Sequence, residues 1–447
     1  MNNERYCADS VFVFVSLILL LASCTNSGSP GLFRKKSPHD SYGDKLKNAG
    51  LSGSALGIKW FTAAEHSLTS PLSVNLPYSE TGYFAAEEPK AVGIIFQAKR
   101  GEKLTISLTK KPTTAFAIYL DLWLPASTND EKPKLLLSAD SATSKLQYEV
   151  DKEGSYILRL QPELLKAGEY TLSISTGPTL AFPVTPEVKS NIGSFWGAGR
   201  DAGSRKHEGI DIFAPRGTPL VAAANGVVTR AGENPLGGKV IFLRPARKDY
   251  TLYYAHLDKQ IAAAGQTVTI GDTIGLVGNT GNARTTQPHL HFGIYTYQGA
   301  IDPLPFVNRV IKTPESISAS LSNLGKWVRN NRRAKLLSEP ASNTDEVTTL
   351  EPNTLLKVEA ATAGWYKALS PRGEAGFIAS TVVTAAATPI NKFILKTPKP
   401  LLDQPDELAA RKTTLPAGKQ VNILAMYKDF YFVRHDKEEG WVLKSSL

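Results

Sequence analysis

Cysteine is nearly absent from this chain of 447 residues, which has only Cys7 and Cys24. Both lie close to the N-terminus, so the rest of the chain has no disulfide and no thiolate ligand for a metal. Any zinc site must therefore use histidine, aspartate or glutamate. Histidine is also scarce, with seven residues in the whole chain, so a place where histidines gather is informative.

The chain also lacks a nucleic-acid-binding motif, and its basic residues are spread along the sequence rather than clustered. We therefore expect no nucleic-acid partner. The formal net charge of +10 suits an anionic cell envelope as a partner. A content of 42% hydrophobic and 21% charged residues is ordinary for a globular protein, and the length predicts about two to four domains.

Long apolar runs are missing except for one near the N-terminus, Val11 to Ala22, which follows the basic Arg5. This run is too short to span a bilayer comfortably, but its length is typical of a signal peptide. It continues into Leu-Ala-Ser-Cys (21–24), which resembles the lipobox of bacterial lipoproteins, where a signal peptidase cuts before a cysteine that carries a diacylglycerol. The resemblance implies a signal peptide over 1–23 and lipidation of Cys24. The alternative is an ordinary secretory signal with a chance cysteine.

Residues 24–54 are polar and contain many Ser, Gly, Pro and Lys residues, which predicts a flexible tether behind the lipid anchor. Such an anchor implies attachment to a membrane of the bacterial cell envelope, with the rest of the chain facing the periplasm. Thr25 follows the cysteine in place of the aspartate that marks inner-membrane retention in some bacteria. We therefore expect the outer membrane rather than the inner one.

Residues 55–187 alternate between apolar and polar side chains, with Gly, Asp and Pro between the alternating segments. Examples are KLTISLTK (103–110), FAIYLDLWL (116–124) and GEYTLSIST (168–176). Period-two patterning of this kind predicts a β-sandwich. The last segment resembles the end of the pre-peptidase-type sandwich modules of secreted bacterial enzymes; the alternative is an unrelated sandwich.

The C-terminal part predicts a helix followed by an internal repeat. Apolar residues at positions 317, 321, 324 and 328 have helical spacing, which predicts a helical linker over 311–334. Beyond it, LLSEP at Leu336 and LLDQP at Leu401 begin two copies of one unit, offset by about 65 residues. Each copy, 335–386 and 387–447, resembles the bacterial SH3-like barrel.

Small barrels of this type are usually binding modules, and in envelope hydrolases they often bind cell-wall peptides. The repeats are therefore expected to contact envelope partners, including proteins. Five aromatic side chains are candidates to line a binding groove: Trp365, Tyr366, Phe430, Tyr431 and Trp441. The alternative is that half of them belong to the barrel cores.

Four of the seven histidines lie within about ninety residues of one another. They stand in three motifs: KHEGIDIFAP, with His207 and Asp211 as H-x-x-x-D; YYAHLDKQ, with His256; and PHLHFGI, with His289 and His291. If PHLHFGI is a strand, its two histidines share one face while the residues beside them point into a core. Both imidazoles can then reach one metal, or one can bind while the other does acid–base chemistry. The alternative is a pair of exposed histidines on a half-buried strand.

Together, residues 195–306 resemble the lysostaphin-type, or LytM-like, zinc metallopeptidase domain. The similarity extends past the histidine motifs to APRGTPLVAAANGVV (214–228), GGKVIFL and the glycine-punctuated GQTVTIGDTIGLVGNTGNA (265–283). The glycines of the last segment permit tight turns where other residues would be strained. We expect a peptidase domain over 188–310, and an active one, because it lacks none of the positions that degenerate, amidase-activating members have lost.

The resemblance implies a role for each polar residue. His207, Asp211 and His291 correspond to three ligands of a zinc ion, which leaves a fourth position for water. His256 and His289 correspond to a pair of histidines that are not ligands. One would accept the water's proton and the other would steady the oxyanion, and which does which stays open.

The family cuts peptide cross-links of peptidoglycan, either glycine bridges or D,D-links between stem peptides. Because a lipid anchor suggests a bacterium with two membranes, we expect a D,D-endopeptidase that acts on meso-diaminopimelate cross-links. The alternatives are a weak or inactive activator of a cell-wall amidase, and a zinc endopeptidase that cuts Gly-rich proteins. The expected fold is mainly β and multidomain, with a β-sandwich, a β-rich peptidase domain around a central antiparallel sheet, and two small SH3-like barrels.

Overall fold

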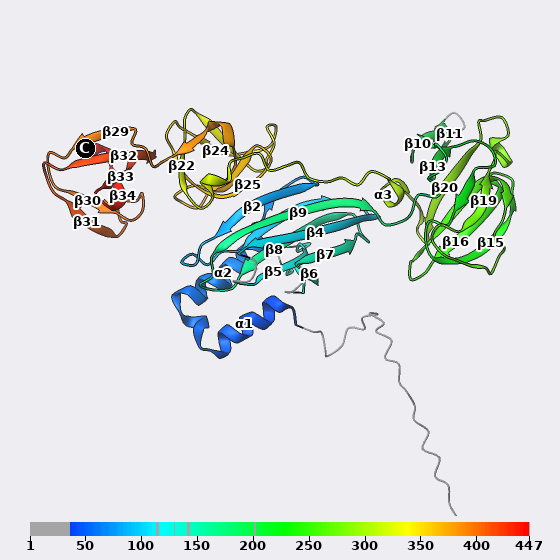
Figure 1. Ribbon diagram of the computed structural model, residues 1–447, viewed down its shortest axis with the longest axis horizontal. Coiled ribbons are helices and arrows are strands. Elements are labelled where there is room, and N and C mark those ends of the chain that lie inside the picture. Colours follow the sequence, from blue (N-terminus) through cyan, green and yellow to red (C-terminus); the bar gives the residue numbers. More distant parts are fainter. Residues whose placement is uncertain (1–35, 113–115, 129, 141–143, 201–202, 447) are drawn as a thin grey trace, which may run out of the picture. The chain divides into compact units, whose positions relative to one another are not determined.

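The computed structural model describes residues 36–112, 116–128, 130–140, 144–200 and 203–446 (Figure 1). The predicted signal peptide, the predicted lipidation site at Cys24 and the first part of the predicted tether lie outside the described residues. No helix in the described part of the chain is long and apolar enough to cross a membrane. The fold is mainly β and contains several sheets, which confirms the predicted fold class.

Two helices precede the first strand, α1 (Pro38–Asn48) and α2 (Ala55–Thr69), with the 3₁₀ turn η1 (Leu51–Gly53) between them. The prediction of a flexible tether as far as residue 54 is therefore wrong. Ser37 caps α1 by accepting a hydrogen bond from a main-chain N–H in its first turn. His39 stacks on Trp60, with ring centroids 4.7 Å apart, and the indole N–H of Trp60 donates to the oxygen of Pro162 at 2.9 Å. These long-range contacts hold a polar segment in helical form.

Nine strands form the predicted sandwich. They are β1 (Leu72–Ser73), β2 (Tyr78–Phe84), β3 (Val92–Ala98), β4 (Glu102–Lys111), β5 (Ile118–Leu124), β6 (Lys134–Ser138), β7 (Lys145–Glu149), β8 (Gly154–Pro162) and β9 (Gly168–Pro178). One sheet has the order β1-β3-β8-β5-β6, and the other contains β2-β9-β4-β7. Apolar side chains from both sheets, such as Leu104 of β4 and Leu158 of β8, form one buried core. Helices α1 and α2, blue in Figure 1, contact strands of the first sheet.

The region expected to be the peptidase domain is built on a second large sheet. Its strands are β10 (Asn191–Ser194), β13 (Ile210–Phe213), β14 (Pro219–Val221), β15 (Gly226–Asn234), β16 (Gly238–Pro245), β17 (Tyr250–Gln260), β18 (Thr267–Val268), β19 (Thr273–Val277), β20 (His289–Thr296) and β21 (Gly299–Ile301). The main order is β10-β13-β20-β17-β16-β15-β18, and neighbouring strands run antiparallel, as predicted. The strands that carry the histidine motifs are therefore neighbours at the centre of the sheet.

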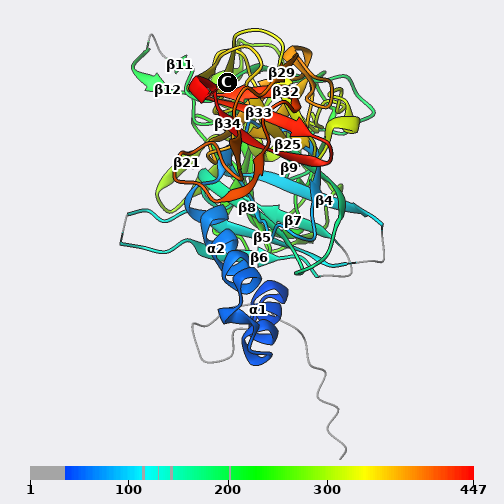
Figure 2. The same ribbon diagram turned by 90° about the vertical axis from the view of Figure 1, so that its left-hand side faces the viewer.

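Three short elements complete this region. Strands β11 (Gly199–Arg200) and β12 (Arg205–Lys206) form a separate two-stranded ribbon between β10 and β13, which Figure 2 shows projecting from the rest of the region. The 3₁₀ turn η3 (Gly281–Ala283) precedes β20, and helix α3 (Leu304–Val307) follows β21.

The helical linker predicted over 311–334 is wrong. This segment contains the 3₁₀ turn η4 (Leu321–Asn323) and strand β22 (Trp327–Asn330) instead. Gly325 between them has a φ of 69°, a left-handed value that ends a helix. Leu321 is exposed, whereas Val328 is fully buried in β22, which pairs with strands on both sides. The helical spacing of the apolar residues was therefore a coincidence.

The two copies of the internal repeat fold into corresponding strands. The first contains β23 (Ala334–Leu337), β24 (Glu346–Leu350), β25 (Leu355–Ala361), β26 (Trp365–Leu369), β27 (Ala375–Ala379), η5 (Ser380–Val382) and β28 (Val383–Ala385). The second contains β29 (Asn391–Ile394), β30 (Lys399–Leu402), β31 (Arg411–Leu415), β32 (Gln420–Tyr427), β33 (Phe430–His435), β34 (Glu438–Leu443) and η6 (Lys444–Ser446). The pair β23 and β24 in the first copy and the pair β30 and β31 in the second have a register irregularity at the same place in the repeat, Leu336/Leu337 and Leu401/Leu402. The SH3-like character of the copies stays a prediction.

Most of the aromatic side chains considered for a binding groove are in the interior. Tyr366 belongs to the core of the first copy, while Phe430 and Trp441 belong to a core of the second. Trp365 packs against the core of the sandwich, because β25 of the first copy pairs with β2. Tyr431 is partly buried and packs against a core of the second copy. Most of the five aromatic residues are therefore core residues, as the alternative to a binding groove proposed.

Candidate metal centre

The candidate metal centre lies where β13 and β20 run side by side. Asp211 and His291 stand opposite each other in this antiparallel pair. Ile212 and Leu290, their neighbours along the strands, are fully buried in the core. Because successive side chains of a strand point to opposite faces, Asp211 and His291 share the face that is turned away from this core. His207 joins them from the loop that leads from β12 into β13.

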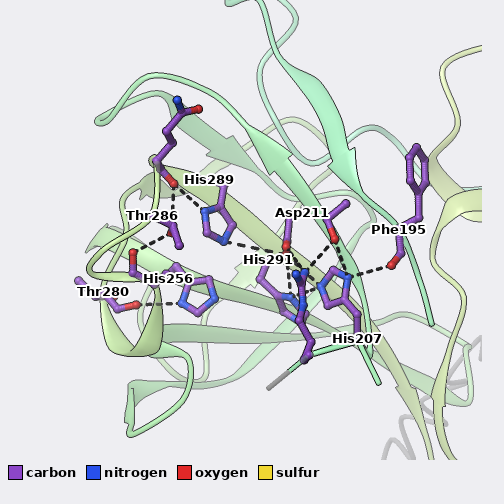
Figure 3. Close-up of polar contacts among 12 residues, drawn as sticks. Phe195, His207, Asp211, His256, Thr280, Thr286, His289 and His291 are labelled. Atoms are coloured by element: carbon purple, nitrogen blue, oxygen red, sulfur yellow. Dashed lines mark hydrogen bonds and ion pairs between the residues drawn. The ribbon is translucent and has the colours of Figure 1, made fainter. Parts of the chain in front are cut away.

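Three polar atoms converge at this point (Figure 3). Nε2 of His207, Oδ1 of Asp211 and Nδ1 of His291 each lie 3.0 Å from the other two. The other ring nitrogen of His207, Nδ1, is 3.0 Å from the main-chain oxygen of Phe195. A carbonyl oxygen only accepts hydrogen bonds, so the proton of His207 lies on Nδ1 and its Nε2 presents a lone pair to the cluster.

Converging lone pairs from two imidazoles and a carboxylate repel one another unless a cation lies between them, and this donor set suits zinc. Within the described residues, these three side chains are a group of His, Cys, Asp or Glu close enough to hold a metal ion. All three side chains are largely buried, so little water competes with them for a metal. Gly209 makes room for the cluster, because a Cβ there would lie 2.7 Å from Cε1 of His291.

The two remaining histidines lie beside this group. The ring centroid of His256 is 5.0 Å from that of His289 and 5.9 Å from that of His291. Nδ1 of His256 donates to the main-chain oxygen of Thr280 at 2.9 Å, and Nδ1 of His289 donates to that of Gln287 at 2.8 Å. Both rings therefore keep their lone pair on Nε2, the form in which an imidazole can accept a proton.

Burial and neighbouring charges set the ionisation of the cluster. Burial lowers the pKa of His256 to about 4, and the charges of His289 and His291 act in the same direction. Burial also lowers the pKa of His291, against the effect of Asp211. Burial alone would raise the pKa of Asp211, but its contacts with the rings of His207 and His291 hold it far below its ordinary range. Neutral imidazoles beside a charged carboxylate are the protonation states that metal binding needs.

The structure thus brings together all five predicted site residues, while their individual roles as ligand or base stay predictions. It also adds residues that the sequence did not single out. Arg200 and Ser194 lie against Asp211, and the main-chain oxygens of Phe195 and Thr280 orient two of the imidazoles. No spacing in the sequence marks these contacts, because they depend on how segments outside the histidine motifs pack against them.

The comparisons with known proteins agree with this geometry. Residues 205–303 match the model of Peptidase family M23, so this part of the chain is similar to the peptidase domains of that family. The family is zinc-dependent, and the three converging side chains form a His-Asp-His group that could hold a metal ion, which confirms zinc as the predicted cofactor.

Three curated relatives match between about a quarter and a half of the chain. An uncharacterized metalloprotease of Haemophilus influenzae is 31% identical over 235 residues, which are 51% of this chain and 45% of the relative. The L-Ala–D-Glu endopeptidase of Bacillus subtilis is 38% identical over 137 residues, 28% of this chain and 42% of that protein. The peptidoglycan DD-endopeptidase ShyC of Vibrio cholerae is 34% identical over 121 residues, 27% of this chain and 24% of that protein. The chain spans less than half the length of each of these relatives.

Proposed function

We propose that the chain is a lipid-anchored zinc metalloendopeptidase that hydrolyses the D,D-linked peptide cross-links of peptidoglycan. The observation that carries this proposal is the convergence of His207, Asp211 and His291, with His256 and His289 beside them. Two imidazole nitrogens and one carboxylate oxygen would supply three protein ligands, and catalytic zinc sites, unlike structural ones, have three protein ligands and a water.

The residues of the chain divide the chemistry between them. His207, Asp211 and His291 would hold zinc, which supplies a water molecule whose pKa is lowered to about 7. Nε2 of His256 or His289 would accept the water's proton and return it to the leaving amine. The low pKa of His256 keeps its Nε2 unprotonated at neutral pH, so it is ready to accept a proton. The other imidazole, once it carries a proton on Nε2, would donate a hydrogen bond to the oxyanion.

The names of the relatives support peptidoglycan as the substrate but differ in the bond. One is an endopeptidase for L-Ala–D-Glu and another a peptidoglycan DD-endopeptidase. The predicted lipobox at Leu21–Cys24 favours the D,D-bond, since a lipid anchor suggests an outer-membrane protein whose substrate is a wall with direct cross-links. The same motif supports our proposal that the chain is held at the outer membrane and faces the periplasm. Mass spectrometry of the N-terminal peptide of the mature protein tests this anchor, because lipidation predicts a peptide that begins at Cys24 and carries a diacylglycerol.

The function is tested by digesting purified peptidoglycan from a bacterium with two membranes with the zinc-loaded chain. Products are separated by chromatography and identified by mass spectrometry, with a chelator and with zinc added back as controls. We expect cross-linked dimers to decrease and monomers to increase, and the chelator to stop this. Cleavage between L-Ala and D-Glu would replace the D,D-bond as the target. An unchanged wall would reject the proposal and favour an amidase activator or a peptidase for Gly-rich proteins. An assay with a cell-wall amidase tests the first alternative, and an assay with elastin tests the second.

A further inference from the structure

Asp211 uses only one of its two carboxylate oxygens in the converging group. Oδ1 faces His207 and His291, whereas Oδ2 accepts a hydrogen bond from Nη2 of Arg200 at 2.5 Å. The same Nη2 of Arg200 also donates to Oγ of Ser194 at 2.8 Å. The side chain of Asp211 is 8% exposed, so this charged oxygen has little water to solvate it.

The backbone places Arg200 at this oxygen from two sides. Ser194 pairs with Asp211 across β10 and β13, beside a local irregularity in the register. Arg200 lies in β11, which pairs with β12 immediately before His207. The N–H of His207 donates to the oxygen of Ala198 at 2.8 Å, just before β11. The ribbon that carries Arg200 is therefore tied to one member of the converging group while its side chain contacts another.

We infer that Arg200 is a positioning residue, which fixes the rotation of the Asp211 carboxylate so that Oδ1 stays aimed at the zinc. A carboxylate with one oxygen on a metal can rotate about its last bond, and a hydrogen bond to the second oxygen opposes that rotation. Partners of this kind change metal affinity by roughly 10- to 100-fold when they are removed. Ser194 supports the arrangement by holding the guanidinium in place.

The sign of the effect separates this role from simple electrostatics. Arg200 adds a positive charge beside the zinc site, and charge repulsion alone would make zinc bind more tightly once that charge is removed. Positioning predicts the opposite, weaker binding. The inference rests on the proposed use of His207, Asp211 and His291 for zinc, but it does not depend on peptidase activity.

The test is the zinc affinity of the full chain, measured by competition with a chromogenic chelator at pH 7.5. The variants are Arg200→Met, Arg200→Lys and Ser194→Ala, with Arg244→Met, an exposed arginine of β16, as the matched control. We expect Arg200→Met to raise the Kd roughly 10- to 100-fold. Arg200→Lys and Ser194→Ala should raise it less, because a lysine keeps one donor and the guanidinium keeps its bond to Asp211. The control should leave it unchanged.

The melting temperature of each metal-free variant separates positioning from a merely structural role. A structural role would lower this temperature and leave the Kd of the folded protein unchanged. An Arg200→Met variant with an unchanged or lower Kd for zinc would overturn the inference. If Arg200→Met does not fold, an unchanged Kd in both Arg200→Lys and Ser194→Ala would overturn it. A wild-type chain that binds zinc but cuts no peptidoglycan would reject the proposed function and leave this inference standing.

Discussion

Asp211 and His291 are 80 residues apart in the sequence, yet Oδ1 of one lies 3.0 Å from Nδ1 of the other. The two meet because β13 and β20 pair in antiparallel register with these residues opposite each other. A slip of one residue would turn one of the two side chains into the core. The register thus joins the H-x-x-x-D and H-x-H motifs into one site.

Removing a proposed ligand should remove zinc and activity together. We expect His207→Ala to lose most of its zinc and to lower kcat/KM by more than about 100-fold, the largest loss typical of a merely supporting residue. Metal analysis after gel filtration and the peptidoglycan digest give the two quantities. His66→Ala, which changes an exposed histidine of α2, is the control. Full zinc content in His207→Ala would show that this residue is not a ligand.

His289→Ala should separate metal binding from catalysis. Because His207, Asp211 and His291 still converge in this variant, we expect it to keep most of its zinc. If His289 is the base, kcat should fall by roughly 10²- to 10⁴-fold, the usual contribution of general acid–base catalysis. The same metal analysis and digest apply. Stoichiometric release of zinc by His289→Ala would mean that the ligand and base assignments are exchanged.

The pH profile should reveal the low pKa of His256. A base must be neutral to accept a proton, and His256 has a pKa lowered to about 4 from its ordinary value of 6.5. If His256 is the base, kcat/KM should therefore hold from pH 7 down to about 5 and fall as the pH drops through about 4. Zinc content is followed at each pH, so that metal loss is not mistaken for titration. A decline centred near pH 6.5 with zinc retained would be at odds with a buried neutral base.

The buried ion pair of the sandwich gives a stability prediction. Arg159 donates to Oδ2 of Asp121 from Nη2 at 2.5 Å, both side chains are at most 5% exposed, and the guanidinium lies over Trp123. Arg159→Met should lower the free energy of unfolding by about 3–5 kcal/mol, because it leaves the carboxylate of Asp121 buried and unpaired. Asp121→Asn combined with Arg159→Met should cost less.

Urea unfolding, with the sandwich transition assigned by hydrogen exchange in β5 and β8, measures this loss. Arg244→Met is again the control, since its side chain is exposed. A loss below about 1 kcal/mol in Arg159→Met would mean that the pair contributes little to stability.

The parts of the fold with regular patterning were predictable from the sequence. The alternation along β9 and along PHLHFGI follows directly from the geometry of a strand, so the sandwich and the shared face of His289 and His291 could be inferred. The five site residues could also be identified from the sequence, because each lies in a motif that resembles one of the lysostaphin-type peptidase family.

The rest depends on contacts between distant residues. Helix α1 is polar and is held by the stacking of His39 on Trp60, which no local pattern reveals. Val328 fits a helical spacing, but pairing on both sides places it in a strand. Arg200 reaches Asp211 of β13 from the separate ribbon of β11 and β12, and no local pattern in the sequence reveals this contact.

The most direct test of the account is a crystal of the zinc-loaded chain measured on both sides of the zinc absorption edge. The anomalous difference map locates the metal without reference to any assumed role. We expect one strong peak bonded to Nε2 of His207, Oδ1 of Asp211 and Nδ1 of His291, with His256 and His289 outside bonding distance. A peak bonded to His289 or His256, or no peak at this cluster, would contradict the assignment of ligands and bases.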